Sequence, residues 1–188
     1  MKSFRRRSAT VNAGSMADIA FLLLIFFLVT TTISADKGIL RQLPANDCPT
    51  KDCSSPINER NILRISLNSE NTIFIEDKIV QLNDVQDIVK SFVDNNGSGS
   101  CDYCEGYKLN DLSDHPNEAV ISLSHDALTK YHMFISVQDE ISKAYFSLRA
   151  HYIKDTFGKV PSDINKDEFK LVKKAYPFKV SEVAVKRN

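Results

Sequence analysis

The sequence predicts a single N-terminal transmembrane helix followed by a small exported domain of mixed α/β (α+β) type. Three observations predict this fold. Residues 16–33 are apolar apart from Asp18 and the threonines at 30–32. Residues 34–60 are rich in Pro, Asn, Asp and Ser, which is typical of a linker. From residue 61 onward, the apolar residues recur with the periods of strands and helices.

Length and charge limit the function classes. The chain has 188 residues, enough for one modest domain plus an appendage, with 24 basic and 24 acidic residues. This balance indicates neither a nucleic-acid-binding protein nor a polyanion. The charges are unevenly placed, because Lys2, Arg5, Arg6 and Arg7 stand together and no acid precedes Asp18.

The apolar segment is long enough to cross a bilayer. At about 1.5 Å per residue, residues 16–33 span roughly 27 Å, close to the ~30 Å hydrocarbon core. A cleaved signal peptide is the alternative, with Ala35 as a small residue near a cleavage site. The apolar run exceeds the usual ~7–15 residues of such a peptide, and an acid has no purpose in a segment that is removed.

The positive-inside rule then sets the domain organisation. We expect a cytoplasmic basic N-terminus at 1–10 and a transmembrane helix at 11–33. A periplasmic linker follows at 34–60, and a periplasmic α/β domain at 61–188. The chain is thus expected in a bacterial inner membrane as a single-pass protein.

The first half of the exported domain is predicted to contain two strands and a helix. NILRISLN at 61–68 alternates apolar and polar residues, and TIFIED at 72–77 resumes the pattern after a turn, so a hairpin is predicted. Asn83 is expected to cap a helix that ends near 95–97. Residues 95–118 form a long polar loop.

The second half adds one strand, two helices and a final strand. AVISLS at 119–124 predicts a strand, and a helix is expected from Tyr131 to Phe157 with Gly158 as its stop. A shorter helix at 163–176 is closed by Pro177, and FKVSEVAV at 178–185 is the last strand. The predicted order is therefore β-β-α-β-α-α-β.

All four cysteines, Cys48, Cys53, Cys101 and Cys104, follow the apolar segment. An oxidising compartment would allow two disulfides there, and four cysteines permit three pairings that the sequence does not separate. A zinc site from CPTKDC and CDYC is the rival, but no histidine lies at ligand spacing near either pair. A redox CxxC is less favoured, because Cys101 and Cys104 lie in a loop rather than opening a helix.

The exported domain shows no catalytic pattern. The four histidines, His115, His125, His132 and His151, are scattered and are interpreted as surface or capping residues. Adjacent Ser124, His125 and Asp126 cannot form a catalytic relay, because chain neighbours do not face one another in a helix. We therefore expect no enzymatic activity, no metal site and no cofactor.

Asp18 is the strongest functional candidate. A charged residue inside a bilayer costs roughly 2.5–3.5 kcal/mol on insertion scales, so it normally faces protein or water and serves function. Helical spacing predicts a common face shared with this acid, comprising Gly14, Ser15, Leu22, Ile25, Val29 and Thr32. Asn12, on the same segment, is a further candidate near the proton site. The alternative places Asp18 near the cytoplasmic interface, solvated and favoured by the helix dipole.

These residues resemble the ExbD/TolR family, the small subunits of proton-driven complexes in bacterial inner membranes. The resemblance is carried by Val11-Asn12, by Asp18 six positions after the asparagine, and by the run ending Val29-Thr30-Thr31. GILRQLPA, LRISLNSENTIFIEDKIVQLNDV and AVISLSHDALTKYHMFISVQDEI extend it across residues 11–145. Gly14-Ser15 replaces a common Thr-Pro, and the cysteine pairs and the expansion at 146–177 are additions reminiscent of Bacteroidetes members.

The resemblance implies a mechanism and partners. Asp18 would carry protons, and the anchor would lie, as a homodimer, within a ring of multi-span ExbB-like subunits. The exported domain would pass work to a TonB-like protein that serves outer-membrane transport. A TolR-like role in envelope integrity, or an envelope-binding module without a proton role, are the alternatives.

Overall fold

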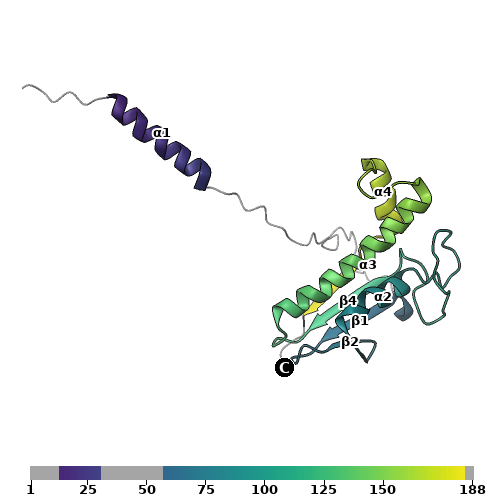
Figure 1. Ribbon diagram of the computed structural model, residues 1–188. Helices are drawn as coiled ribbons and strands as arrows, with labels where there is room; N and C mark the ends of the chain where they lie inside the picture. Colours follow the sequence, from purple (N-terminus) through teal and green to yellow (C-terminus); the bar gives the residue numbers. More distant parts are fainter. Residues whose placement is uncertain (1–12, 31–56, 185–188) are drawn as a thin grey trace, which may run out of the picture. The chain divides into compact units, whose positions relative to one another are not determined.

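The computed structural model describes residues 13–30 and 57–184, which fall into two separate units of the chain. The first unit contains helix α1, Ala13–Thr30. Its 18 residues have a mean hydropathy of 2.1, so by length and composition the helix could cross a membrane. Every residue of α1 (purple in Figure 1) is exposed, whereas the core helix of a soluble protein is mostly buried.

The second unit is built on a five-stranded mixed sheet in the order β3-β2-β1-β4-β5. The strands are β1 (Ile62–Leu67), β2 (Ile73–Ile75), β3 (Lys78–Val80), β4 (Val120–His125) and β5 (Val180–Ala184). β1, β2 and β3 pair antiparallel, whereas β4 runs parallel to both β1 and β5. An apolar N-terminal helix followed by a small α/β domain is therefore confirmed.

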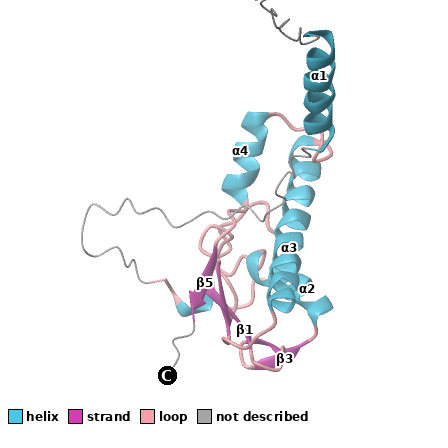
Figure 2. Ribbon diagram, turned by 90° about the vertical axis from the view of Figure 1, so that its left-hand side faces the viewer, coloured by secondary structure: helices cyan, strands magenta, loops and turns pink. Residues whose placement is uncertain are grey.

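The core lies on one face of this sheet. Alternate strand residues are buried, among them Leu63, Ile65 and Leu67 of β1 and Ile121 and Leu123 of β4. Helices α2 (Leu82–Val93) and α3 (Tyr131–Phe157) cover that face, and they lie together on one side of the strands in Figure 2. The intervening strand residues, such as Arg64, are only partly buried or exposed, as expected for a sheet covered on one side.

The C-terminal helices follow the sequence signals closely. α3 begins at Tyr131 and ends at Phe157 as predicted, because Gly158 adopts the left-handed conformation with φ of 63°. Helix α4, Lys166–Ala175, lies within the range expected for the shorter helix. Its start is fixed by a capping box, in which the Asn165 side chain accepts from the Glu168 backbone N–H and Glu168 accepts from that of Asn165.

Two details of the predicted secondary structure were wrong. Strand β3 was missed, so the observed order is β-β-β-α-β-α-α-β. It is joined to β2 by a two-residue turn in which Glu76 and Asp77 both have positive φ, a conformation usually signalled by Asn-Gly. Asn83 does not cap α2, because the helix already begins at Leu82 and Gln81 occupies the N-cap position.

The loop at 95–118 contains neither helix nor strand, yet it is tightly fixed. The buried Asn95 donates to the carbonyls of Leu109 and Ser113, and its Oδ1 accepts from the Leu109 N–H at 2.8 Å. Asn96 exchanges two hydrogen bonds with the backbone of Cys101. These amides replace the missing backbone ladder, so the loop can hold side chains in fixed positions.

Candidate functional site

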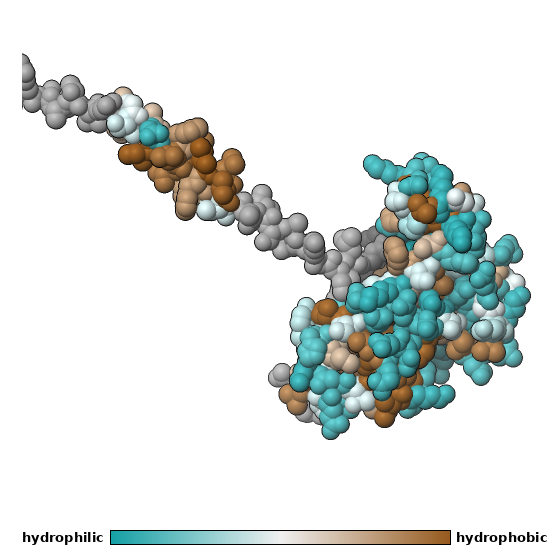
Figure 3. All heavy atoms as spheres, in the orientation of Figure 1, coloured by the Kyte–Doolittle hydropathy of each residue, from teal (hydrophilic) through white to brown (hydrophobic). Residues whose placement is uncertain are grey.

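Asp18 interrupts an otherwise apolar helix. It lies five residues after Ala13, about 8 Å along the helix axis at the usual rise. Figure 3 shows a small hydrophilic spot near one end of α1, followed along the helix by hydrophobic side chains. Asn12 and Thr32, two of the predicted site residues, lie outside the described part of the chain.

The remaining residues of the predicted face are all in α1. Gly14 and Ser15 lie four and three positions before Asp18, and Leu22, Ile25 and Val29 continue the same side of the helix. Small residues beside a polar one are typical of close helix–helix packing in membranes. Thr30 donates its hydroxyl to the Phe26 carbonyl at 2.8 Å, so this polar group is satisfied within the helix.

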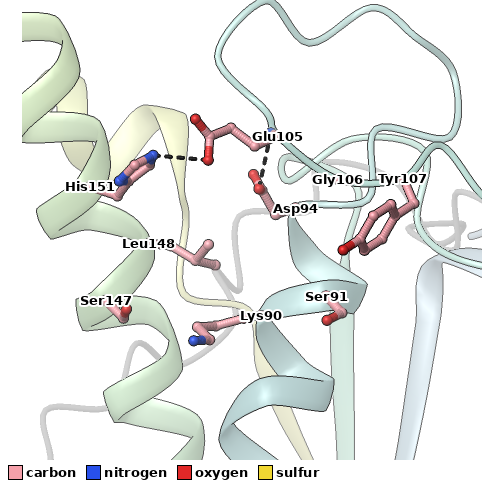
Figure 4. Close-up of a pocket in the computed structure, with 9 residues that line it drawn as sticks. All are labelled: Lys90, Ser91, Asp94, Glu105, Gly106, Tyr107, Ser147, Leu148 and His151. Atoms are coloured by element: carbon pink, nitrogen blue, oxygen red, sulfur yellow. Dashed lines mark hydrogen bonds and ion pairs between the residues drawn. The ribbon is translucent and has the colours of Figure 1, made fainter.

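The α/β domain has an open pocket of its own, with a volume of about 440 Å³. It lies between the end of α2, the loop at 95–118 and the C-terminal half of α3 (Figure 4). The lining residues are Lys90, Ser91, Asp94, Glu105, Gly106, Tyr107, Ser147, Leu148 and His151. Sequence reasoning missed this pocket, because its residues come from segments up to 61 positions apart.

A charged cluster lies at the rim of this pocket. His151 Nε2 is 3.0 Å from Glu105 Oε2 and 3.0 Å from Asp155 Oδ2. The hydrogen bond with Glu105 is the main reason that the pKa of His151 is raised. The spacing of His151 and Asp155, four apart on one helix, was the only sequence signal for this cluster.

Asp94 also lines the pocket and lies next to Glu105 (Figure 4). Its carboxylate accepts from the Tyr176 hydroxyl at 2.6 Å and from the Glu105 backbone N–H at 3.1 Å. Burial raises the pKa of Asp94, although the hydrogen bond from Tyr176 opposes that change. The hydrogen bond between Tyr176 and Asp94 joins the segment after α4 to the end of α2.

The other histidines occupy ordinary structural positions. His115 Nδ1 accepts from the Asn117 N–H at 3.0 Å, a local hydrogen bond within a turn. The ring of His125 packs against Phe134 with centroids 4.7 Å apart. His132 is exposed on the first turn of α3.

The second pair of cysteines is joined. Cys101 and Cys104 form a disulfide with their Cα atoms 5.6 Å apart, and Cys48 and Cys53 lie outside the described residues. The intervening Tyr103 packs edge-on against Tyr152 and Tyr176, and its hydroxyl donates to the Ala175 carbonyl at 2.9 Å. The disulfide thus closes a short loop that docks onto α3 and the end of α4.

Comparison with protein families gives a match over most of the chain. Residues 5–151 match the family model described as biopolymer transport protein ExbD/TolR, which covers more than three quarters of the chain. The matched region includes α1, so the apolar helix is part of the family pattern. A comparison with curated protein sequences found no matching relative.

Proposed function

The chain belongs to the ExbD/TolR family, and from this premise we propose that it is the small, proton-coupled subunit of an energy-transducing complex. Family membership and helix α1 indicate a single-pass membrane protein that acts in biopolymer transport. The proposal adds what Asp18 does, how the chain is oriented and which proteins it works with. Members of this family are transport accessory proteins, which is consistent with a role other than catalysis.

The observation that carries the proposal is a lone acid in a helix that is apolar all round. An aspartate within the hydrocarbon core costs roughly 2.5–3.5 kcal/mol, and such residues line proton or ion pathways. The face formed by Gly14, Ser15 and Asp18 would therefore pack against protein, whereas the Leu, Ile and Phe side chains elsewhere on α1 suit lipid or apolar partners.

Protonation then provides a switch between two positions. A neutral Asp18 can move past apolar walls, whereas an ionised Asp18 requires a polar partner, so each form favours different surroundings. One proton that crosses 100 mV releases about 2.3 kcal/mol, which is comparable to the cost of placing the acid in the membrane. Proton flow past Asp18 could therefore drive repeated movement of α1, with the proton as the coupling ion and no bound cofactor.

The proposed orientation and partners follow from charge and family. Lys2 and Arg5–Arg7 hold the N-terminus in the cytoplasm, so the α/β domain lies in the periplasm of a bacterial inner membrane. We place α1, as a homodimer, within a ring of multi-span ExbB-like subunits. The α/β domain passes work to a TonB-like protein for outer-membrane transport.

The test is a conservative change at Asp18 in cells that depend on this protein for energised uptake. Asp18→Asn keeps the size and polarity of the side chain but removes its ability to bind and release a proton, so we expect normal membrane insertion and partner co-purification with uptake lost. Asp18→Glu should retain part of the uptake, because it keeps a carboxyl group. Phe27→Leu, on the opposite face of α1, is the matched control and should transport normally. Wild-type uptake by Asp18→Asn would overturn the proposal.

The family description names both ExbD and TolR, so envelope integrity is the second candidate function. The same variants distinguish the two. Loss of receptor-dependent uptake with an intact envelope indicates the ExbD role, whereas detergent sensitivity with normal uptake indicates the TolR role. If Asp18→Ala is wild type in both assays, the protein is a tethered binding module instead.

A further inference from the structure

We propose that Glu105, His151 and Asp155 form a binding site for a divalent transition-metal ion, with Zn²⁺ as its best match. Each residue offers one ligand atom, and the three atoms lie within 4.8 Å of one another. The site is independent of Asp18, because it belongs to the other unit of the chain. Asp155 lies beyond the region that matches the family, so the site combines a family segment with the C-terminal expansion.

The three ligands come from two elements that face each other. His151 and Asp155 are four residues apart on the last turns of α3, so both point from one side of the helix. Glu105 reaches His151 from the loop at 95–118, which faces α3 across the pocket (Figure 4). A metal ion at this point would bridge the loop and the helix.

The side chains of Glu105, His151 and Asp155 would satisfy one another better with a bound cation than without one. Two carboxylate oxygens converge on His151 Nε2, each at 3.0 Å, but this nitrogen carries at most one hydrogen. A metal ion could instead accept a lone pair from all three atoms. Zn²⁺ binds His nitrogen and carboxylate oxygen at about 2.0–2.2 Å, so tetrahedral ligand atoms lie roughly 3.4 Å apart. Each carboxylate oxygen would therefore need to move away from His151 Nε2 by only a few tenths of an ångström.

The ligand types select the class of metal. An imidazole nitrogen combined with two carboxylates suits Zn²⁺ and its transition-metal neighbours. Ca²⁺ and Mg²⁺ prefer oxygen ligands alone, and Mg²⁺ keeps several waters. The pocket of about 440 Å³, which Glu105 and His151 line, provides room for the water that would complete a four-coordinate site.

The loop ligand is held in place by its neighbours. Glu105 directly follows Cys104, whose disulfide to Cys101 restrains the chain. The N–H groups of Glu105 and Gly106 donate to the side chain and backbone carbonyl of Asp94, both at 3.1 Å. Such restraint lowers the entropic cost of collecting ligands from two elements.

The test uses the full chain in detergent micelles, purified without a histidine tag, with free thiols alkylated so that Cys48 and Cys53 cannot contribute. Zn²⁺ is titrated in competition with a chromophoric chelator. We expect one equivalent to bind and to raise the thermal unfolding temperature. His151→Gln should abolish this binding, and Glu105→Gln and Asp155→Asn should each weaken it at least tenfold.

His132→Gln is the matched control, because His132 is an exposed histidine on the same helix. It should bind Zn²⁺ as the wild type does. The three ligand side chains are about half exposed or more, so their variants should fold normally, which circular dichroism checks. Wild-type affinity in His151→Gln, loss of binding in His132→Gln, or no bound equivalent in the wild type would overturn the proposal.

Discussion

Removing Arg60 should destabilise the α/β domain more than removing Asp114, although Asp114 is the buried partner of the pair. The Arg60 guanidinium contacts both Asp114 oxygens, with Nε 2.8 Å from Oδ2. The side chains are 44% and 6% exposed, respectively. This ion pair joins the residues before β1 to the end of the loop at 95–118.

The magnitude depends on which groups are left without a partner. In Arg60→Ala, the hydrogen bond that the Asp114 carboxylate keeps from the described residues is the 3.3 Å one from Asn61, so a nearly uncompensated buried charge costs about 3 kcal/mol. In Asp114→Ala, Arg60 turns to solvent and the Asn61 amide keeps its 2.9 Å bond to Glu118. The loss is then about 2 kcal/mol, the value of a charge-assisted hydrogen bond. The double variant should resemble Asp114→Ala.

Urea unfolding of the full chain in micelles, followed by far-UV circular dichroism, measures these three free energies. The double-mutant cycle is decisive, since residues in contact should be strongly non-additive. The reasoning is refuted if Asp114→Ala is the more destabilised single variant. It is also refuted if the double variant loses the sum of the two single losses, about 5 kcal/mol.

Three further changes can be measured by the same unfolding assay. A Cβ at residue 106 would lie 2.2 Å from the Asp94 carbonyl oxygen, so Gly106→Ala should displace the loop and cost on the order of 2 kcal/mol. Replacing Cys101 and Cys104 by Ser opens a four-residue loop and should cost about 2 kcal/mol. Asn165→Ala removes the capping box of α4 and should cost about 1 kcal/mol.

Each of these changes has its own control. Gly99→Ala meets no atom within 4 Å, so only its positive φ is penalised, and it should be milder than Gly106→Ala. Reductant should destabilise the wild type more than the double Ser variant. The double Ser variant should respond only through Cys48 and Cys53, which both proteins contain. Asn165→Asp keeps an N-cap acceptor and should be nearly neutral. The opposite order in any pair would contradict the stated cause.

The sequence predicted the structure best where few residue types can adopt the required backbone conformation. Gly158 permits the left-handed conformation that ends α3, so the bounds of that helix were predicted correctly. The apolar alternation of 61–68 marked β1 in the same way. β3 carried no such signal, because its three residues Lys78–Val80 are exposed or partly exposed and its Glu-Asp turn is atypical.

The pocket could not be predicted for a different reason. Glu105 and His151 are brought together by the docking of a polar loop, and that docking depends on the buried amides of Asn95 and Asn96. Buried asparagines in a loop have no periodic pattern to reveal them. Asp18, by contrast, could be identified from the sequence alone, because it is an acid within an otherwise apolar segment.

The direction of the strands determines how the domain would bear mechanical load. The chain enters at the start of β1 and leaves at the end of β5, and both strands run parallel to β4 between them. Tension between these two points acts along the strands and across the ladder hydrogen bonds. The bonds are then loaded in shear and must break together rather than unzip singly, so the domain could transmit a pull while staying folded.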